Sequence, residues 1–371
     1  MATQAVAECL PGLARATIRR RGVSEDVAAI DEAVLARYLP GKIEGFGRLQ
    51  GARKFAGGQS NPTFLLTADS GRYVLRRKPP GQLLQSAHAV DREFRAMAAL
   101  AGTGVPVPKA YHLCEDEEII GSVFFVMEYL EGRIFWDPAL PEVAREERGP
   151  IFDAMNRALA ALHLVEVEAV GLADFGRPGN YFARQVSRWW KQYQATGTQY
   201  IPEMEPLAAW LEERMPEDDG KAALVHGDYR LDNIIFAPDT PADAPKMLGV
   251  LDWELSTLGH PWSDLAYQCM QWRLPNEGVF RGLGTLDRRE HGLPDEADYV
   301  AAYCRRCGID GIPIWSFCLA FSFFRLAAIL QGVLKRALDG NASNPERGLK
   351  MGAAVPILAR MAIDVIEQED R

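Results

Sequence analysis

Residues 224–236 read LVHGDYRLDNIIF, which is an apolar strand, a polar loop and a second apolar strand in direct succession. Because apolar backbone holds this loop on both sides, we expect its polar side chains to lie at the floor of a cleft. Asp228 is placed to accept a proton from an attacking hydroxyl group. Asn233 offers a neutral oxygen to a hard cation. The alternative, in which these residues only cap turns, is disfavoured because several chemically useful groups share one loop.

A second carboxylate follows another apolar run, in the sequence LDWE at residues 251–254. Mg²⁺ prefers oxygen ligands and usually takes one or two carboxylates from the protein together with phosphate oxygens. Asn233 and Asp252 are therefore a candidate magnesium site.

Residues 226–233 together with Asp252 resemble the catalytic loop and the metal-binding aspartate of the aminoglycoside phosphotransferase and choline kinase families, which are relatives of protein kinases. The resemblance implies a phosphotransferase that uses ATP and Mg²⁺. It implies that Asp228 is the catalytic base, which orients and deprotonates the acceptor hydroxyl. It also implies that Asn233 and Asp252 hold Mg²⁺ against the nucleotide phosphates.

Three neighbouring residues have supporting roles by the same resemblance. Arg230 lies inside the catalytic loop and is expected to contact the transferred phosphate or an anionic acceptor, as a second catalytic residue. His226 is expected to brace the loop rather than take part in the chemistry. Asp264 matches the second aspartate of the family and is expected to anchor backbone rather than metal.

The resemblance extends to the first third of the chain, where FAGGQSN at residues 55–61 takes the place of the phosphate-binding loop, with a plain hairpin turn as the alternative. Arg76 takes the position of the lysine that contacts phosphates in kinases, although Lys78 shares its side of the strand. Glu93 matches the helix glutamate that pairs with this cation, with a solvated surface charge as the alternative. The expected nucleotide contacts are Gly57, Gly58, Gln59, Ser60, Asn61, Arg76, Glu93 and, through the hinge backbone, Glu128 and Leu130.

The patterning predicts a small β-rich lobe followed by a larger helical lobe. The resemblance implies that these are the two lobes of an α+β, protein-kinase-like fold. Residues 30–130 are expected to form a small nucleotide-binding lobe with an antiparallel sheet and a helix. Residues 131–371 are expected to form a larger helical lobe with the catalytic and acceptor sites, and residues 1–29 an extension. The expected strands cover 47–54, 63–67, 72–76, 119–120, 123–129, 223–225 and 247–251. The expected helices cover 86–100, 151–165, 181–196, 205–215, 295–307 and 314–338.

Three segments indicate a narrower group: LRRKPPG at 75–81, LDWELSTLG at 251–259 and YVAAYC at 299–304. Together they resemble the kinase domains fused to acyl-CoA dehydrogenases in animals, and free-standing bacterial relatives of those domains. The resemblance implies a small-molecule acceptor, namely the hydroxyl of a 4-hydroxyacyl-CoA or a related hydroxy acid. A kinase for a cationic acceptor such as choline or an aminoglycoside, and a nucleotide-binding pseudokinase, are the alternatives.

The residues that contact the acceptor are harder to identify. Arg184, Arg188 and Lys191 share one face of an expected helix, which suits an anionic acyl-CoA or an ordinary solvated surface. Trp189 and Trp190 fit either the core or a stacking contact with a ligand. The other candidates are Tyr193, Trp272, Arg230 and Arg273.

The composition limits the remaining functions. The chain has 371 residues with a net charge of −9, which argues against nucleic acid and anionic membranes as partners. Six sparse cysteines favour a reducing, cytoplasmic location, and we expect Cys304 and Cys307 on a helix rather than at a zinc site. Residues 314–334 are long and apolar enough to span a bilayer, but Arg325 in their middle favours a buried helix. The sequence leaves a monomer and a homodimer open.

Overall fold

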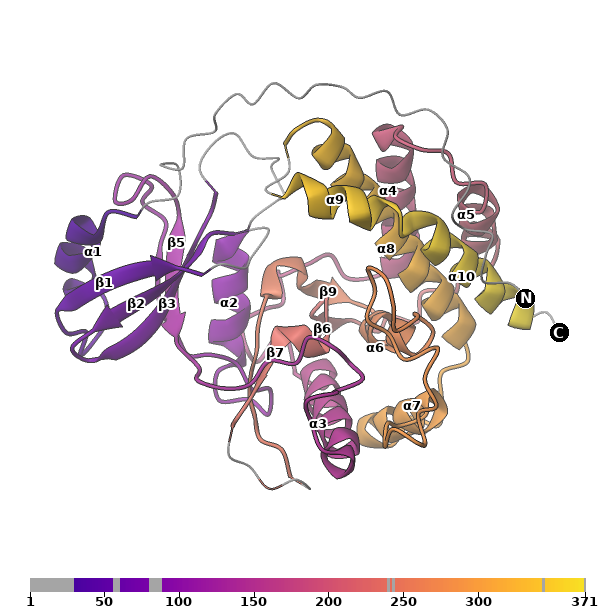
Figure 1. Ribbon diagram of the computed structural model, residues 1–371, viewed down its shortest axis with the longest axis horizontal. Coiled ribbons are helices and arrows are strands. Elements are labelled where there is room, and N and C mark those ends of the chain that lie inside the picture. Colours follow the sequence, from indigo (N-terminus) through magenta and orange to yellow (C-terminus); the bar gives the residue numbers. More distant parts are fainter. Residues whose placement is uncertain are drawn as a thin grey trace.

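The computed structural model describes residues 30–55, 61–79, 89–238, 241, 244–341 and 344–369. Within these ranges the chain forms two lobes that lie side by side (Figure 1). The smaller lobe is a sheet with a helix on each face, and the larger lobe is mainly helical. This is the protein-kinase-like arrangement that the sequence predicts.

The sheet of the smaller lobe has five antiparallel strands in the order β1-β2-β3-β5-β4. A tight turn after β2 leads directly into β3, so these strands pair along their whole length, as alternating patterns joined by Asp-Ser-Gly predict. The elements are α1 (Glu32–Tyr38), β1 (Leu49–Lys54), β2 (Thr63–Ala68), β3 (Gly71–Arg77), α2 (Val90–Leu100), β4 (Ala110–Cys114) and β5 (Phe124–Glu128).

Alternation along the strands gives the sheet two apolar faces. Phe124 and Val126 pack in a small core with α1, whereas Phe125 and Met127 pack toward α2 and the larger lobe. Val74 of β3 belongs to the second of these faces. Since side chains two residues apart on a strand share a face, Arg76 points to the side of α2 and the larger lobe.

The larger lobe is built around helix packing and two short hairpins, β6 with β9 and β7 with β8. Its helices are α3 (Arg145–His163), α4 (Tyr181–Thr196), α5 (Met204–Glu213), α6 (Pro261–Cys269), α7 (Glu296–Cys307), α8 (Trp315–Leu338), α9 (Pro345–Gly352) and α10 (Val355–Glu369). Its strands are β6 (Ala223–Val225), β7 (Ile234–Phe236), β8 (Met247–Val250) and β9 (Thr257–Gly259). Short 3-10 turns lie at Leu39–Gly41, Leu231–Asn233, Trp253–Leu255 and Met270–Trp272.

Helix α8 is the central helix of the larger lobe and packs against α4, α6, α9 and α10. Among the described residues it is the one helix long and apolar enough to cross a membrane, and 83% of its most apolar window is buried inside the protein. Arg325, in its middle, is only 6% exposed. The prediction of a buried helix over this segment is confirmed.

Two expected elements differ from the structure. The expected strand at 119–120 is a turn, and the strand beside β5 on the side away from β3 is β4, which ends five residues before Ile119. Isoleucine favours β-strands, but Ile119 and Ile120 pack against the small core from a turn. Helix α3 begins at Arg145, earlier than expected, and tolerates Pro150 near its start. The start of the helix expected at 86–100 lies partly outside the described residues.

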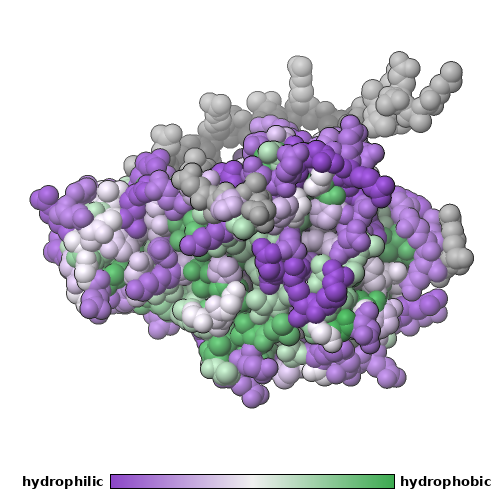
Figure 2. All heavy atoms as spheres, turned by 90° about the horizontal axis from the view of Figure 1, so that it is seen from below, coloured by the Kyte–Doolittle hydropathy of each residue, from purple (hydrophilic) through white to green (hydrophobic). Residues whose placement is uncertain are grey.

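The surface is mostly hydrophilic on the face shown in Figure 2, with the largest group of apolar side chains near its lower edge and smaller groups elsewhere. Large apolar side chains that are well exposed include Tyr200 and Trp136, at 73% and 71%. Isolated exposed apolar residues are ordinary on globular proteins, so an exposed tryptophan is informative only where it borders a cavity.

Candidate active site

The loop between β6 and β7 holds Asp228 at the edge of the core, with 23% of its side chain exposed. Tyr267 donates its hydroxyl to Oδ1 of Asp228 at 2.7 Å. Asn233 donates its side-chain amide to Oδ2 at 3.2 Å and to the Asp228 carbonyl at 2.9 Å. The carboxylate is therefore oriented at both oxygens and is still accessible to a ligand.

Two buried residues hold this loop from behind. Asp264 accepts hydrogen bonds from the backbone N–H of His226 at 2.5 Å and of Gly227 at 2.8 Å. The His226 ring accepts the Asp228 N–H at Nδ1, which assigns the proton to Nε2, the atom that contacts the Leu251 carbonyl at 2.9 Å. The predicted bracing role of His226 and the predicted backbone anchor at Asp264 are both confirmed.

Two backbone conformations fix the position of Asp252 relative to the loop. Gly227 has a φ of +83°, and a Cβ there would lie 2.7 Å from the carbonyl oxygen of Leu255, so only glycine fits. Asp252 has a φ of +66°, a region that aspartate enters more readily than most residues. The Leu251 N–H donates to the Asn233 carbonyl at 2.8 Å, so Asn233 and Asp252 lie at neighbouring ends of the β7–β8 hairpin.

Four charged side chains, the charged cluster, connect the two lobes: Arg76, Glu93, Asp252 and Glu254. The Arg76 guanidinium lies 3.1 Å from Glu93, 2.7 Å from Asp252 and 3.5 Å from Glu254. Burial alone would lower the pKa of Arg76, but the three carboxylates raise it above its ordinary value. Burial holds the pKa of Glu93 above its ordinary value, and the charge of Arg76 acts against that rise.

The charged cluster resolves two alternatives that the sequence leaves open. Of the two cations on the same side of β3, Arg76 enters the cluster, whereas Lys78 lies 3.8 Å from Asp91 with 31% of its side chain exposed. Glu93 is 1% exposed and faces Arg76, so the alternative of a solvated surface charge is wrong.

Only Phe55 and Asn61, the first and last residues of the expected phosphate loop, are described. Residues 56–60 lie outside the described residues. Asn61 is buried, and its side-chain amide donates to Oε2 of Glu254 at 3.2 Å. Of the expected phosphate contacts, Asn61 is therefore placed beside the charged cluster.

The two expected hinge residues, Glu128 and Leu130, differ in their backbone hydrogen bonds. The Glu128 N–H donates to the Lys109 carbonyl at 2.9 Å, and its carboxylate accepts the Lys109 N–H at 3.1 Å, so Glu128 is engaged with the neighbouring strand. Leu130 makes no backbone hydrogen bond to any described residue, which leaves its N–H and carbonyl open to a ligand. Its side chain packs against Gly249 of β8.

A pocket of about 370 Å³ opens beside the catalytic loop, and we call it the acceptor pocket. Much of its wall is apolar, from α6, the turn after it and α8. Arg230 borders it, 3.4 Å from Asp228 and 2.7 Å from Asp232. The charge of Asp228 is the largest cause that raises the pKa of Arg230, so this guanidinium stays cationic. The lining residues include Trp136, Asp137, Arg230, Asp232, Tyr267, Met270, Gln271, Leu274, Phe280, Arg281, Leu326, Leu330, Arg347 and Met351.

Most of the acceptor residues expected from sequence lie elsewhere. Trp189 and Trp272 are buried in the core, at 7% and 3% exposure, and Trp190 stacks on Tyr193. Arg273 pairs with Glu296. A second cavity, of about 400 Å³, lies beside His260 and the α4 start, and no residue of the catalytic loop lines it. The expected contacts that do not line the acceptor pocket are Arg184, Arg188, Trp189, Trp190, Lys191, Tyr193, Trp272 and Arg273.

Several residues of the site escape sequence reasoning. Trp136, Arg281 and Arg347 come from separate segments without a shared motif, so no spacing signal connects them. Tyr267 carried a usable signal, because it lies three residues after Asp264 on α6, and residues at that spacing share a helix face.

The comparisons with known proteins agree with this geometry. Residues 51–299 match the model of the phosphotransferase enzyme family, APH. The chain is 45% identical to acyl-CoA dehydrogenase family member 10 of Mus musculus over 92% of this chain and 32% of that protein. It is 44% identical to the probable acyl-CoA dehydrogenase IBR3 of Arabidopsis thaliana over 92% of this chain and 43% of that protein. The chain thus spans less than half the length of these curated relatives.

Solved structures show the same fold. A Ralstonia eutropha JMP134 protein, described provisionally as an aminoglycoside phosphotransferase, is 46% identical with a TM-score of 0.82, over 92% of this chain and 99% of that one. The aminoglycoside phosphotransferase APH(4)-Ia, in complex with ADP and hygromycin B, is 14% identical with a TM-score of 0.58, over 89% and 98% of the two chains. The chain therefore belongs to the APH phosphotransferase family, and it is a kinase-type phosphotransferase with a protein-kinase-like fold.

Proposed function

We propose that this protein transfers the γ-phosphoryl group of ATP, with Mg²⁺, to the hydroxyl of a 4-hydroxyacyl-CoA or a related hydroxy acid. The observation that carries the proposal is the place of Asp228. On one side, Arg230 of the catalytic loop borders the acceptor pocket. On the other side, His226 and Asn233 form hydrogen bonds with Leu251, the residue before Asp252. A base between the two regions can accept a proton from a hydroxyl in the acceptor pocket while a nucleotide is bound at the charged cluster.

The donor set at the hairpin ends fits Mg²⁺. Asn233 uses its amide nitrogen for both of its side-chain hydrogen bonds, which leaves Oδ1 available as a ligand. Asp252 engages Arg76 through Oδ1, which leaves Oδ2. One amide oxygen and one carboxylate oxygen, completed by phosphate oxygens, are what a magnesium–nucleotide site usually requires. When bound there, Mg²⁺ would neutralise charge on the β- and γ-phosphates.

The protein's own residues then have separate tasks. Arg76 would contact nucleotide phosphates from the buried side, held by Glu93. The acceptor oxygen attacks the γ-phosphorus, the bond from that phosphorus to the bridging oxygen of ADP breaks, and the hydroxyl proton passes to Asp228. Arg230 lies close enough to Asp228 to stabilise the transferred group or an anionic acceptor.

The acceptor pocket supports an anionic acceptor with an apolar body. Met270, Leu274 and Leu330 give it apolar walls, and three arginines but only two aspartates line it. Arg281 is exposed and forms no ion pair with any described residue, so its charge is available to a ligand. A choline or aminoglycoside site would instead favour an excess of carboxylates. The relatives named as acyl-CoA dehydrogenases are consistent with an acyl-CoA, although the matched region is only part of those proteins.

The test is an ADP-release assay with ATP and Mg²⁺ across a panel of acceptors. The panel contains 4-hydroxyacyl-CoAs, the matching pantetheine thioesters, the free hydroxy acids, choline and aminoglycosides. We expect the CoA thioesters to give the highest kcat/KM and the cations to give none. Turnover with choline or an aminoglycoside alone would contradict the acceptor class. Nucleotide binding without turnover of any acceptor would instead favour the pseudokinase.

A further inference from the structure

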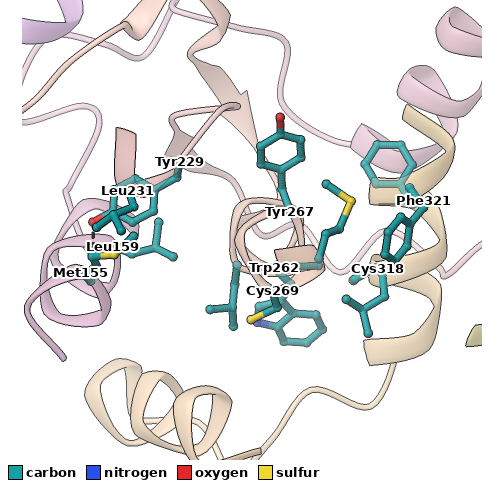
Figure 3. Close-up of a cluster of buried hydrophobic side chains, with 14 of the residues drawn as sticks. Met155, Leu159, Tyr229, Leu231, Trp262, Tyr267, Cys269, Cys318 and Phe321 are labelled. Atoms are coloured by element: carbon teal, nitrogen blue, oxygen red, sulfur yellow. Dashed lines mark hydrogen bonds between the residues drawn. The ribbon is translucent and has the colours of Figure 1, made fainter. Parts of the chain in front are cut away.

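Helix α6 places the hydroxyl of Tyr267 against the catalytic loop. The Tyr267 ring packs among buried apolar side chains, and its hydroxyl points out of that cluster (Figure 3). The hydroxyl donates to Oδ1 of Asp228 at 2.7 Å. Burial raises the pKa of Tyr267 well above its ordinary value and the charge of Asp228 adds to the rise, so the phenol keeps its proton and stays a donor.

Helix α8 places a buried cation against the same tyrosine and the same loop. Arg325 donates to the Gly227 carbonyl at 2.8 Å, one residue before Asp228. Its guanidinium carbon lies 5.3 Å from the centre of the Tyr267 ring and 5.9 Å from that of Trp189. It has no carboxylate partner among the described residues. A buried arginine in an apolar helix is costly, and its hydrogen bond and ring contacts offset part of that cost.

The side-chain torsion of aspartate gives a reason for this arrangement. The terminal torsion of an Asp carboxylate has a broad energy profile, so the side chain alone does not fix the direction of its oxygens. Tyr267 binds Oδ1 and Asn233 binds Oδ2, and together they restrict that rotation. A base held in one orientation meets the acceptor hydroxyl without reorganising during the reaction.

We propose that Tyr267 is a positioning residue for the Asp228 carboxylate, and that Arg325 holds the Tyr267 ring and the loop backbone in place for it. This inference rests on the proposed role of Asp228 as the base, and it does not depend on which acceptor the enzyme uses. Tyr267 also lines the acceptor pocket, so its hydroxyl fixes the carboxylate on the side where the acceptor would enter.

A tyrosine that only satisfies its own buried hydroxyl would have a different signature. Tyr299 of α7 is the matched control, because it is 3% exposed. Its hydroxyl donates at 2.8 Å to Oε1 of Gln268, which lies next to Tyr267 on α6. It has no contact with Asp228. Tyr299→Phe therefore removes a comparable buried hydrogen bond that does not involve Asp228.

The experiment compares kcat and KM for ATP in Tyr267→Phe, Tyr299→Phe and the wild type. For Tyr267→Phe we expect kcat to fall by about 10- to 100-fold, the range for losing a hydrogen bond to a charged group, with an unchanged KM for ATP. For Tyr299→Phe we expect kcat close to that of the wild type. Equal kcat in Tyr267→Phe and the wild type, or the same loss in both variants, would overturn the proposal.

A double-mutant cycle with Asp228→Asn tests whether Tyr267 acts through Asp228. Tyr267→Phe should have no further effect on the residual rate of Asp228→Asn, and an additive loss would contradict the inference. All rates are also measured for ATP hydrolysis by water without an acceptor. A failed acceptor assignment then leaves the Tyr267 comparison intact.

Arg325 is tested by Arg325→Lys, which keeps the charge but loses the planar fork. We expect a folded protein with a lower kcat and an unchanged KM for ATP. Circular dichroism and thermal unfolding confirm that the variant folds. A folded Arg325→Lys protein with wild-type kcat would remove Arg325 from the proposal.

Discussion

The charged cluster and the acceptor pocket meet at the catalytic loop, but they are built in opposite ways. In the charged cluster one guanidinium faces three carboxylates, and the pair at its centre is almost fully buried. In the acceptor pocket the walls are largely apolar, and three arginines outnumber two aspartates. Counted over these side chains, the first region has an excess of negative charge and the second has a small excess of positive charge. A divalent cation would balance the first excess, and an anionic acceptor would balance the second.

The largest effect should come from Asp228, the residue that serves both regions. Asp228→Asn keeps the shape of the loop but removes the proton acceptor, so we expect kcat to fall by about 10³-fold. Nucleotide binding should persist, because the charged cluster is untouched. Steady-state kinetics and thermal stabilisation by ATP measure the two effects. A variant with wild-type kcat would remove Asp228 from the mechanism.

The next effect concerns the negative excess of the charged cluster. Asp252→Ala should abolish the Mg²⁺-dependent part of nucleotide binding, because it removes one of the two proposed ligands. Calorimetric titration with ATP, in Mg²⁺ and in EDTA, measures this directly. Asp298→Asn, on the exposed start of α7, is the control for loss of one surface carboxylate. Equal ATP affinity in the wild type and Asp252→Ala with Mg²⁺ would place the metal elsewhere.

A smaller effect separates the two cations of β3. Arg76→Ala should raise the KM for ATP by about tenfold, since a charge-assisted contact with phosphate is lost. It also leaves Glu93 buried without its partner, so thermal unfolding is measured alongside. Lys78→Ala should change the KM for ATP by less than about twofold, because exposed pairs contribute little. The reverse ranking would mean that the nucleotide contacts Lys78 instead.

The smallest effect concerns the positive excess of the acceptor pocket. Arg281→Ala should raise the KM for a hydroxyacyl-CoA by about 3- to 10-fold, as expected for one exposed ionic contact. It should leave the KM for the matching pantetheine thioester unchanged, because that acceptor lacks the nucleotide phosphates. The same pair of acceptors with Trp136→Ala tests whether the exposed indole stacks on the acceptor. If Arg281→Ala changed the KM for both acceptors equally, Arg281 would not contact the CoA phosphates.

The sequence is most informative where residues that act together also lie close together along the chain. The catalytic loop, the carboxylate after β8 and the Arg76–Glu93 pair each lie in a short segment with an interpretable pattern, and the structure brings them together. Cys304 and Cys307 lie on α7, as expected. The packing of the sheet also follows from simple alternation along β5.

The acceptor pocket could not be predicted in the same way. Trp136, Arg281 and Arg347 are brought together by the packing of distant segments, and nothing in their local sequence marks them. The basic and aromatic residues of α4 form a clearer local pattern for an acceptor site, but Trp189 is buried in the core. The sequence shows Arg325 as a charge that does not suit a membrane span, but its contact with the catalytic loop depends on tertiary packing.

The most direct test of the account is analysis of the reaction product. The protein is incubated with ATP, Mg²⁺ and a 4-hydroxyacyl-CoA, and the acceptor is examined by mass spectrometry and ³¹P NMR, with Asp228→Asn in parallel. The account predicts an acceptor heavier by one phosphoryl group, with a phosphoester on its hydroxyl, formed by the wild type alone. An unmodified acceptor alongside a phosphorylated choline or aminoglycoside in the same assay would contradict it.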